Sequence, residues 1–333
     1  MTSNVGIVVI GKDEGERLRA CLESLKAYQV PTVYVDSGST DDSVALADGY
    51  GAEVIELDMS IPFSAARARN AGYQQLLKSH PDIQFFQFID GDCTLAPDWL
   101  PAAIDSFNQD DKLAAVFGHL HEKNPDLSPY NKLCELEWRS PVGEASNGAF
   151  GGIVMLRASA LQEVGGYNTR LTAGEEPELG ARMKLAGYRT RKIDQKMATH
   201  DANMTRFTQW WKRAVRFGHA QGLRSHISTI PNTADNNRKI KSTWFWGLLL
   251  PLIVIVSAIP SKGFSLVLLG GYLVLGYRIF SYRRNTGDTL AESLLYTQYT
   301  ILEKFANALG LLKFSVKHKF GKTQDVECNK RID

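Results

Sequence analysis

Two carboxylates separated by a single glycine, Asp90 and Asp92, follow the apolar run at residues 84–89. Hard divalent cations take oxygen ligands, and a departing diphosphate needs a cation to neutralise its charge. The triplet is therefore a candidate site for Mg²⁺ or Mn²⁺. Taken alone, it is more typical of an acidic turn before a helix, here starting at Pro97 and Asp98, so the interpretation depends on the other acidic positions.

Two further acidic positions lie where the pattern predicts the end of a strand or the start of a helix. Asp36 ends the apolar run at residues 32–36, and a carboxylate at a strand end can accept hydrogen bonds from a base or a ribose. A capped turn between strand and helix explains the same residues. Glu175 and Glu176 precede Pro177 at a predicted helix N-terminus, where ordinary acidic capping is the alternative.

A histidine and a glycine-rich stretch are the remaining chemical candidates of this region. His200 is a candidate third metal ligand, because imidazole readily joins carboxylates around Mn²⁺. A lone histidine more often has a structural role, so both interpretations stay open. The small residues at 146–152 would let the backbone approach a sugar closely, or they form only a loop that enters a strand at Ile153.

Apolar runs bounded by turn residues predict strands that alternate with helices. The expected strands are residues 5–10, 32–36, 53–57, 84–90 and 113–117. Helices are expected at residues 14–28, from a capping box at Ser39 and Asp42, and from Ser64. This alternation predicts an α/β fold with a mostly parallel sheet, whose ligands bind at the carboxyl ends of the strands. Asp36 and the triplet at residues 90–92 both lie at such ends.

The composition of the 333 residues excludes several classes of protein. With 38 Lys and Arg against 36 Asp and Glu, the net charge of +2 gives no global field for nucleic acid. The four cysteines are widely spaced, which argues against a disulfide framework and a structural zinc site. The first residues lack the pattern of a signal peptide, so the N-terminal domain is expected in the cytosol.

Two apolar segments, residues 244–260 and 264–280, are near the lower length limit for a helix that spans a bilayer. A three-residue turn joins them, and basic residues flank the pair on both sides. The positive-inside rule then places both ends in the cytosol as a helical hairpin, either spanning or re-entrant. Two buried core helices of a soluble domain are the alternative, which the missing polar face disfavours. The flanking basic residues are Arg238, Lys239, Lys241, Arg278, Arg283 and Arg284.

Two helices next to this hairpin combine apolar and basic residues. In the C-terminal one, apolar residues recur every three or four positions from Leu295 to a basic end at residues 317–319. It is expected to lie on the bilayer or to pack on the N-terminal domain. The other, at residues 206–224, suits a membrane surface or an anionic lipid diphosphate. Its candidate acceptor or lipid contacts are Trp211, Arg213 and Arg216.

Five motifs occur in an order that is more specific than any one of them: V-D-S-G-S-T-D, R-A-R-N-A-G, F-I-D-G-D, G-E-E-P-E-L-G-A-R and G-Y-R. Over about residues 5–218 this set resembles the landmarks of family 2 glycosyltransferases with the GT-A fold. The resemblance implies a Rossmann-like catalytic domain at residues 1–225. A linker at 226–242, two transmembrane helices at 243–283, and an amphipathic helix with tail at 284–333 complete the predicted organisation.

The resemblance also implies roles for individual residues. Asp36 would contact the nucleotide base, Asp90 the ribose or the metal, and Asp92 would ligate Mg²⁺ or Mn²⁺ on the diphosphate. Arg69 would contact the nucleotide, or is a solvated helix arginine. Glu176, with Glu175 beside it, aligns with the general base, although glutamate replaces the usual aspartate. The opening segment departs from the commoner pattern, since Asp13 stands where such enzymes often carry asparagine.

These roles predict an inverting, metal-dependent transfer of one sugar from a nucleotide-sugar. The hairpin adds the expectation of a membrane-bound acceptor, a polyprenyl-diphosphate-linked saccharide of surface polysaccharide biosynthesis, reached from the cytosolic face of the inner membrane. Processive relatives carry Q-x-x-R-W, which the residues after Gln209 do not match. A sugar nucleotidyltransferase is an alternative, disfavoured because no Gly-rich basic loop is found near the N-terminus. A nucleotide-binding membrane scaffold without turnover is another, to which Glu176 lends weight.

Overall fold

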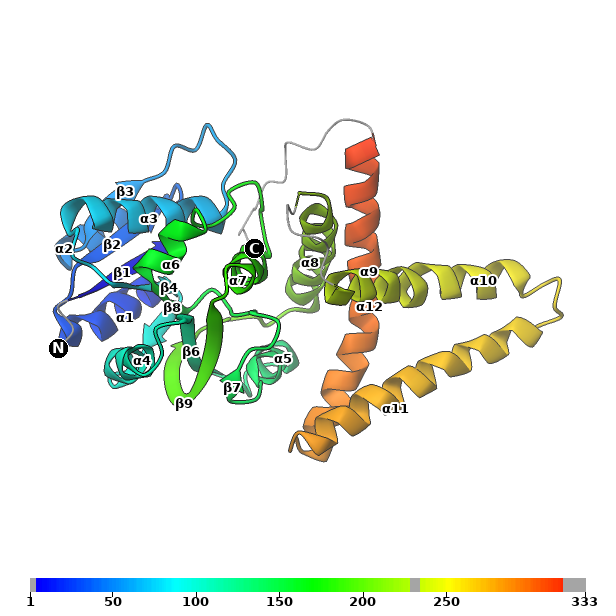
Figure 1. Cartoon of the computed structure of the whole chain (residues 1–333). Coiled ribbons are helices and arrows are strands. Elements are labelled where there is room, and N and C mark those ends of the chain that lie inside the picture. Colours follow the sequence, from blue (N-terminus) through cyan, green and yellow to red (C-terminus); the bar gives the residue numbers. More distant parts are fainter. Residues whose placement is uncertain (1–3, 228–233, 320–333) are drawn as a thin grey trace. The chain divides into compact units, whose positions relative to one another are not determined.

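The computed structural model describes residues 4–227 and 234–319, and it consists of two units. Within the described residues, the first unit comprises residues 4–124 and 137–203, and the second comprises 125–136, 204–227 and 234–319 (Figure 1). Residues 228–233 of the predicted linker lie outside the described residues, as does Cys328, whereas Cys21, Cys93 and Cys134 are free thiols.

A nine-stranded mixed sheet forms the first unit, in the order β3-β2-β1-β4-β8-β6-β9-β5, with β7 paired to β9. The first four strands in this order are parallel, β6 and β9 are parallel, and β8 runs antiparallel between β4 and β6. All residues of β1 are buried, as expected for a strand covered on both faces. The strands are β1 Val5–Gly11, β2 Thr32–Asp36, β3 Glu53–Glu56, β4 Phe85–Asp90, β5 Cys93–Leu95, β6 Leu113–Glu122, β7 Gly143–Glu144, β8 Val154–Arg157 and β9 Arg189–His200.

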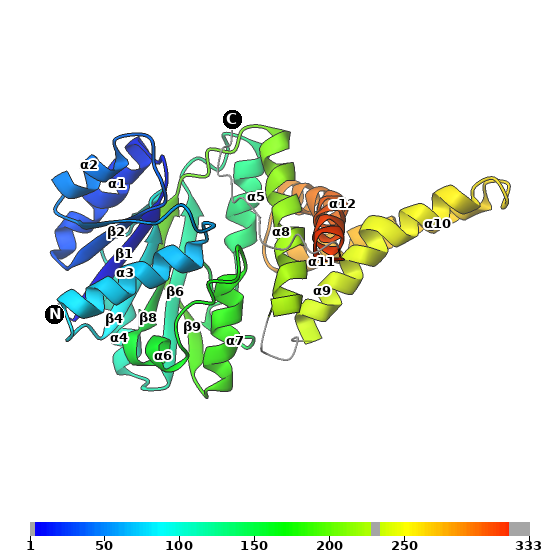
Figure 2. The same cartoon turned by 90° about the horizontal axis from the view of Figure 1, so that it is seen from above.

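Helices cover both faces of this sheet, which confirms the predicted α/β architecture (Figure 2). One buried cluster joins α1, α2 and α4 to the sheet, and a second cluster joins α3, α6 and α7 to the other face. The bounds are α1 Glu16–Leu25, η1 Lys26–Tyr28, α2 Ser43–Gly49, α3 Ala65–Ser79, α4 Trp99–Asn108, α6 Ala158–Glu163 and α7 Glu175–Leu185. The predicted apolar face of α1 is confirmed, since Leu18, Cys21, Leu22 and Leu25 are buried.

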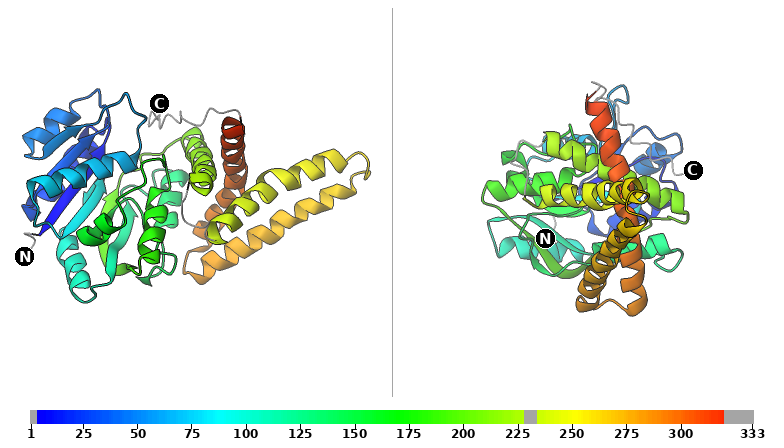
Figure 3. Two further views of the ribbon diagram at one scale, coloured as in Figure 1. Left: turned by 45° about the horizontal axis from the view of Figure 1, so that its top comes forward. Right: turned by 90° about the vertical axis from the view of Figure 1, so that its right-hand side faces the viewer.

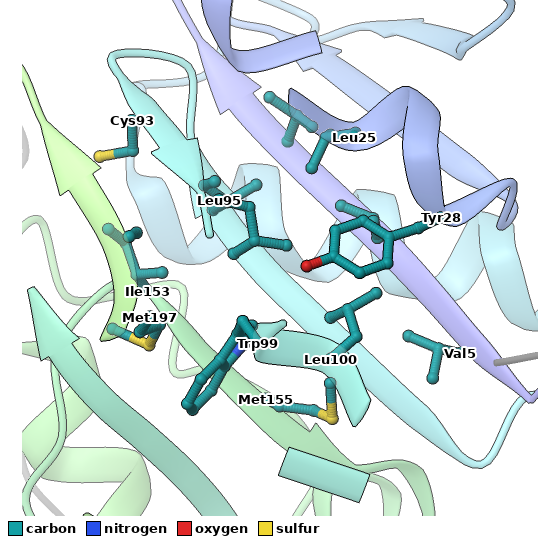
Figure 4. Close-up of a cluster of buried hydrophobic side chains, with 14 of the residues drawn as sticks. Val5, Leu25, Tyr28, Cys93, Leu95, Trp99, Leu100, Ile153, Met155 and Met197 are labelled. Atoms are coloured by element: carbon teal, nitrogen blue, oxygen red, sulfur yellow. The ribbon is translucent and has the colours of Figure 1, made fainter. Parts of the chain in front are cut away.

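The first cluster fixes α4 next to the strands that carry the acidic triplet (Figure 4). Trp99 is fully buried there, and its Nε1 donates to Oε1 of Gln87 on β4 at 2.7 Å. The Tyr28 hydroxyl donates to the carbonyl of Ala96, just after β5. Truncating such a buried tryptophan to alanine costs about 3–5 kcal/mol, so this core holds β4 and β5 in place.

The structure corrects one predicted helix start and confirms another. The expected capping box at Ser39 and Asp42 is wrong, because α2 begins at Ser43. The Ser39 hydroxyl instead donates to Asp36 and accepts from the backbone N–H of Asp13, so it joins two loops rather than capping a helix. Ser64 does cap α3, since its hydroxyl oxygen accepts from the N–H of Arg67 at 3.2 Å.

The second unit is helical, and its longest helix, α12, packs along α8. An added Cβ at Gly218 of α8 would lie 2.2 Å from the carbonyl oxygen of Asn307, so the two backbones approach closely. Ala306, Leu311 and Phe314 of α12 are buried. The bounds are α5 Pro129–Trp138, whose residues 129–136 belong here, α8 Phe207–Ile227, α9 Ala234–Trp244, η2 Phe245–Leu249, α10 Leu250–Ser257, η3 Phe264–Leu269, α11 Gly270–Asn285 and α12 Leu290–Lys319.

The two apolar segments form a helical hairpin, which Figure 3 shows in yellow and light orange. The continuous helices Asn236–Ser257 and Phe264–Asn285 have 22 residues each, and an 18-residue stretch within each has a mean hydropathy of 1.7 and 1.5, respectively. Large side chains near the turn are open, with Ile259 90% and Phe264 81% exposed. This exposure contradicts the alternative of two buried core helices. Length and composition allow both helices to cross a membrane.

Candidate functional site

The parallel register brings the predicted acidic strand ends to one edge of the sheet. Asp36, the last residue of β2, is paired with Gly11 of β1, and Ile10 of β1 is paired with Asp90 at the end of β4. Three neighbouring strands therefore end together, and Asp92 follows directly. This edge is where ligands of open α/β sheets bind, as predicted from the strand pattern.

A buried arginine, Arg69, gathers three carboxylates beside this edge. Its Nη2 lies 3.2 Å from Asp90 Oδ1, and its Nη1 lies 2.8 Å from Glu175 Oε1 and 3.1 Å from Glu176 Oε1. Only 3% of the Arg69 side chain is exposed, so the alternative of a solvated helix arginine is wrong. The cluster contains three carboxylates and one guanidinium. A buried ion pair that only stabilises the fold is expected to have balanced charges, so this acidic excess is unusual.

Small residues let α3 place Arg69 at this depth. An added Cβ at Gly72 would lie 2.4 Å from Cγ1 of Val8, so α3 lies directly on β1. Next to Arg69, the side chain of Asn70 accepts from the N–H of Tyr167 at 2.9 Å and donates to its carbonyl at 2.8 Å. The Tyr167 ring then lies 5.6 Å from the Arg69 guanidinium. This packing locks the arginine in one orientation.

The N-terminus of α7 supplies the two glutamates. Gly174 precedes them with φ of 79°, a conformation that favours glycine at this turn. Glu175 is almost fully enclosed, and burial, followed by the charge of Glu176, raises its pKa to about 7 although Arg69 opposes the shift. The Glu176 side chain is 17% exposed. Of the pair, Glu176 is therefore the carboxylate that solvent can reach.

The glycine-rich stretch at residues 146–152 lies against this cluster. An added Cβ at Gly152 would lie 2.5 Å from Arg69 Nη2 and 3.3 Å from both Asp90 Oδ2 and Glu176 Oε1. Gly148 is equally close to Gly180 of α7, where a Cβ would lie 2.6 Å from the carbonyl oxygen. The loop thus forms one wall of the carboxylate cluster, and a close approach of its backbone to a sugar stays a prediction.

A second group of candidate ligands surrounds Asp92. The ligand atoms of Asp92, Cys93 and His200 lie within 4.8 Å of one another, and His200 Nε2 is 3.6 Å from Asp92 Oδ2. Cys93 is fully buried, and burial raises the pKa of its thiol well above the usual value, which makes it a poor ligand for a hard cation. Asp92 and His200 fit Mn²⁺ or Mg²⁺ better, and the predicted pairing of these two residues is found.

The structure adds Glu122, which the sequence interpretation did not consider. Its Oε2 lies 3.3 Å from His200 Nδ1. Burial lowers the pKa of His200, but the hydrogen bond to Glu122 and the charge of Asp92 outweigh it, and the pKa is raised. The predicted strand ended at Phe117, five residues before Glu122, whereas β6 continues to Glu122. The polar alternation after Phe117 was the available signal.

Asp36 and Asp13 hold the two loops at the strand ends together. Asp36 is buried and accepts from the N–H groups of Gly38 and Ser39 at 2.9 and 2.8 Å, and from the hydroxyl of Tyr34 at 3.1 Å. Asp13, with φ of 51°, accepts from Thr40 N–H at 2.6 Å, and this bond lowers its pKa. The carboxylate at Asp13 therefore serves as a loop clamp. Contact of Asp36 with a base stays a prediction.

The predicted acceptor residues Trp211, Arg213 and Arg216 lie on α8, in the second unit. The Trp211 ring is 5.7 Å from that of Phe207, within an aromatic group that also includes Trp210. Gln209 accepts from the N–H of Thr205 and Arg206 and so caps the helix. The role of these residues in binding an acceptor or lipid stays a prediction.

Known proteins similar to this chain are glycosyltransferases. It is 26% identical over 230 residues to the pre-mycofactocin glycosyltransferases of two Mycobacterium tuberculosis strains, CDC 1551 and H37Rv. The match covers 65% of the chain but only 46% of those proteins, so the chain spans about half the length of the curated relatives it matches.

A solved structure is similar over almost the whole chain. The mannosyltransferase PcManGT from Pyrobaculum calidifontis, in complex with GDP-Man and Mn²⁺, superposes with a TM-score of 0.56 at 15% identity. The superposition covers 96% of this chain and 88% of that one, and it confirms the predicted GT-A fold. The family model for glycosyl transferase family 2 matches residues 6–164, from β1 through α6. Residues 6–164 are therefore similar to glycosyl transferase family 2, which agrees with the family resemblance predicted from the motifs.

Proposed function

We propose that this chain transfers one sugar from a nucleotide-sugar to an acceptor hydroxyl with inversion, and that the acceptor is a lipid-linked saccharide at the cytosolic face of the inner membrane. The observation that carries the catalytic part is the bridge made by Arg69. It ties Asp90, beside the triplet, to Glu176, the partly exposed glutamate of α7. Arg69 and Asp90, two of the predicted donor residues, therefore share one preorganised cluster with the predicted base.

Glu176 acts in this proposal as the general base. Its carboxylate takes the proton of the acceptor hydroxyl while the hydroxyl oxygen forms a bond to the anomeric carbon and the bond from that carbon to the diphosphate breaks. Arg69 aims the carboxylate through the contact of 3.1 Å, and Glu175 holds Arg69 from the buried side at 2.8 Å. A single displacement of this kind inverts the anomeric configuration.

Asp92 and His200 would hold Mg²⁺ or Mn²⁺, which supplies neutralisation of the leaving diphosphate when it is bound. Asp90 lies at the same edge, where Arg69 engages its Oδ1, so its Oδ2 would be the oxygen for the ribose or the cation. Asp36 would receive the base, in a loop that Asp13 and Thr40 keep in place. The donor thus lies along the carboxyl ends of β1, β2 and β4.

The membrane-bound acceptor is proposed from the second unit. The hairpin exposes long apolar side chains over both helices, for example Ile255 at 71% and Leu273 at 79%, a surface that fits a bilayer. The α8 residues Trp211, Arg213 and Arg216 combine aromatic and basic groups, which suits a lipid diphosphate. Surface polysaccharide biosynthesis is the process that such an acceptor serves.

The test uses the full chain in membranes, with Mn²⁺, a panel of labelled UDP- and GDP-sugars, and a lipid extract. We expect release of nucleoside diphosphate and label in the lipid fraction. Label that enters only water-soluble product would refute the lipid acceptor. Release of pyrophosphate would favour a nucleotidyltransferase, and nucleotide binding without product would favour the scaffold. Glu16→Gln is a matched control, because this glutamate is 85% exposed and pairs with Arg19 of its own helix.

A further inference from the structure

Glu122 is enclosed at the end of β6, directly beside His200. Its side chain has 0% exposure, which for a carboxylate requires hydrogen-bond partners. One partner is His200, whose Nδ1 lies 3.3 Å from Oε2. The backbone N–H of Ala202 donates to both oxygens at 3.3 and 3.2 Å, and the N–H of Asn124 donates to Oε1 at 3.4 Å. The carboxylate is thus held by backbone groups just after the ends of β6 and β9.

The sheet register places these groups in one row across three strands. Cys93 of β5 is paired with His200 of β9, and His200 is paired with Glu122 of β6. Asp92, the residue before Cys93, then reaches the opposite side of the imidazole, with Oδ2 3.6 Å from Nε2. Each ring nitrogen of His200 therefore faces a different carboxylate.

The two carboxylates impose different demands on the ring. Glu122 lies in a closed environment that already supplies backbone donors, and an ionised carboxylate only accepts, so Nδ1 must carry the hydrogen. In the neutral ring this leaves the lone pair on Nε2, which faces Asp92. The ring plane is held as well, because the Trp138 ring packs against His200 at 5.0 Å with an interplanar angle of 76°.

We propose that Glu122 is a positioning residue of the metal site: it fixes the Nδ1–H tautomer and the orientation of His200, so that Nε2 is presented with Asp92 to a divalent cation. This inference rests on the proposed function, which assigns the cation to Asp92 and His200. Glu122 itself does not touch the cation. Carboxylates that accept from the second nitrogen of a metal-binding histidine typically contribute about 10- to 100-fold in metal affinity.

The first experiment is carried out on the wild-type chain, and a single variant is needed only to assign the signals. Nitrogen-15 labelled histidine is incorporated into the full chain, which is studied in detergent without metal at alkaline pH, where the ring is neutral. The His200→Gln protein identifies the His200 signals among those of seven histidines. We expect the chemical shifts of a ring protonated on Nδ1. A ring protonated on Nε2 would overturn the proposal.

The second experiment is a double-mutant cycle on Mn²⁺ affinity, measured by electron paramagnetic resonance on the full chain in detergent. Glu122→Gln is expected to weaken Mn²⁺ binding about 10- to 100-fold in the wild-type background. In the His200→Gln background the same change should have little further effect, because Glu122 acts through His200. A merely structural role would weaken binding equally in both backgrounds.

The outcomes separate this inference from the proposed function. Wild-type chain that binds Mn²⁺, together with equal losses in both backgrounds, overturns the role of Glu122 and leaves the metal site standing. Wild-type chain that does not bind Mn²⁺ overturns the metal site and the inference with it. Glu137→Gln, a change to an exposed glutamate, is the matched control and should leave Mn²⁺ affinity unchanged.

Discussion

Two buried arginines of this chain have opposite surroundings. Arg69 lies in the first unit with three carboxylates around it, whereas Arg283, at the end of α11, has a carboxylate partner in Asp288. Arg283 also donates to the carbonyl of Leu136 at 3.1 Å and lies over the Tyr296 ring at 4.2 Å. Charge is balanced at Arg283 and left negative around Arg69.

This difference separates a structural ion pair from a site that is prepared for ligands. A balanced buried pair has little to gain from a further charge, and breaking it mainly exposes the remaining partner to an apolar environment. An acidic excess, in contrast, lowers the cost of bringing in a cation or a proton. The surroundings of Arg69 therefore indicate function, and those of Arg283 indicate anchoring of the hairpin.

The largest expected effect is on the rate of sugar transfer, when a carboxylate that contacts Arg69 is changed. Glu176→Gln keeps the size of the side chain but removes the base, and it should slow sugar transfer about 10²- to 10⁴-fold. The rate of nucleoside diphosphate release measures this. Asp288→Asn, which removes a carboxylate at the balanced site, should leave the rate per folded molecule close to that of the wild type. An equal loss of transfer rate in both variants would show that the carboxylates around Arg69 have no special role in catalysis.

The next largest effect is on the free energy of unfolding, which should respond differently to loss of Arg283 and loss of Arg69. Arg283→Gln removes the guanidinium that contacts Asp288, Leu136 and Tyr296, and should lower the free energy of unfolding by about 3–5 kcal/mol. Thermal unfolding in detergent, followed by tryptophan fluorescence, measures the change. Arg69→Gln should behave differently, since its three carboxylates repel one another when ionised. Its loss of stability should be larger at alkaline than at mildly acidic pH, and the same loss at both would count against the acidic excess.

A smaller effect is the pH dependence that Glu175 confers on the wild type. Burial raises its pKa from 4.5 to about 7, so the folded chain binds a proton more tightly than the unfolded chain. This stabilisation is fully present below pH 4.5 and is lost as the pH rises through about 7, a change on the order of 1–3 kcal/mol. Unfolding experiments over this range should show the slope, and Glu175→Gln should flatten it.

The smallest expected effect concerns Mn²⁺ affinity. Burial lowers the pKa of His200, but the hydrogen bond to Glu122 and the charge of Asp92 raise it overall. A proton therefore competes with the cation for this side chain. Affinity should fall about tenfold per pH unit below that pKa, because one proton is displaced on binding. Calorimetric titrations at several pH values measure the slope. Persistence of the same slope in His200→Gln would exclude the histidine as a ligand.

The sheet and its acidic edge were predictable because strand patterns are local. Apolar runs ended at Asp36 and Asp90, and the parallel pairing of neighbouring strands then placed both carboxylates at one edge. The capping box was misplaced because the hydroxyl of Ser39 has a partner in another loop, the N–H of Asp13, and this partner is 26 positions away.

The arrangement around the site was less predictable, since it depends on distant contacts. Arg69 and Glu175 are 106 positions apart, and a charged side chain on a helix is ordinarily expected in solvent. Glu122 was missed because the register shifts on either side of His119 put the alternation after Phe117 out of phase with the alternation before it. The hairpin was predicted as two apolar segments, and its exposed surface agrees with that pattern.

The register shifts between β6 and β9 determine where related sequences can gain or lose a residue in β6. The register of β6 against β9 shifts between Leu113 and Ala115, and again around His119, but the last three pairs, ending at Glu122 and His200, are regular. A single inserted residue in the final stretch would turn Glu122 to the other face of the sheet. Insertions and deletions in this strand should therefore be tolerated at the bulges and selected against beyond Leu120.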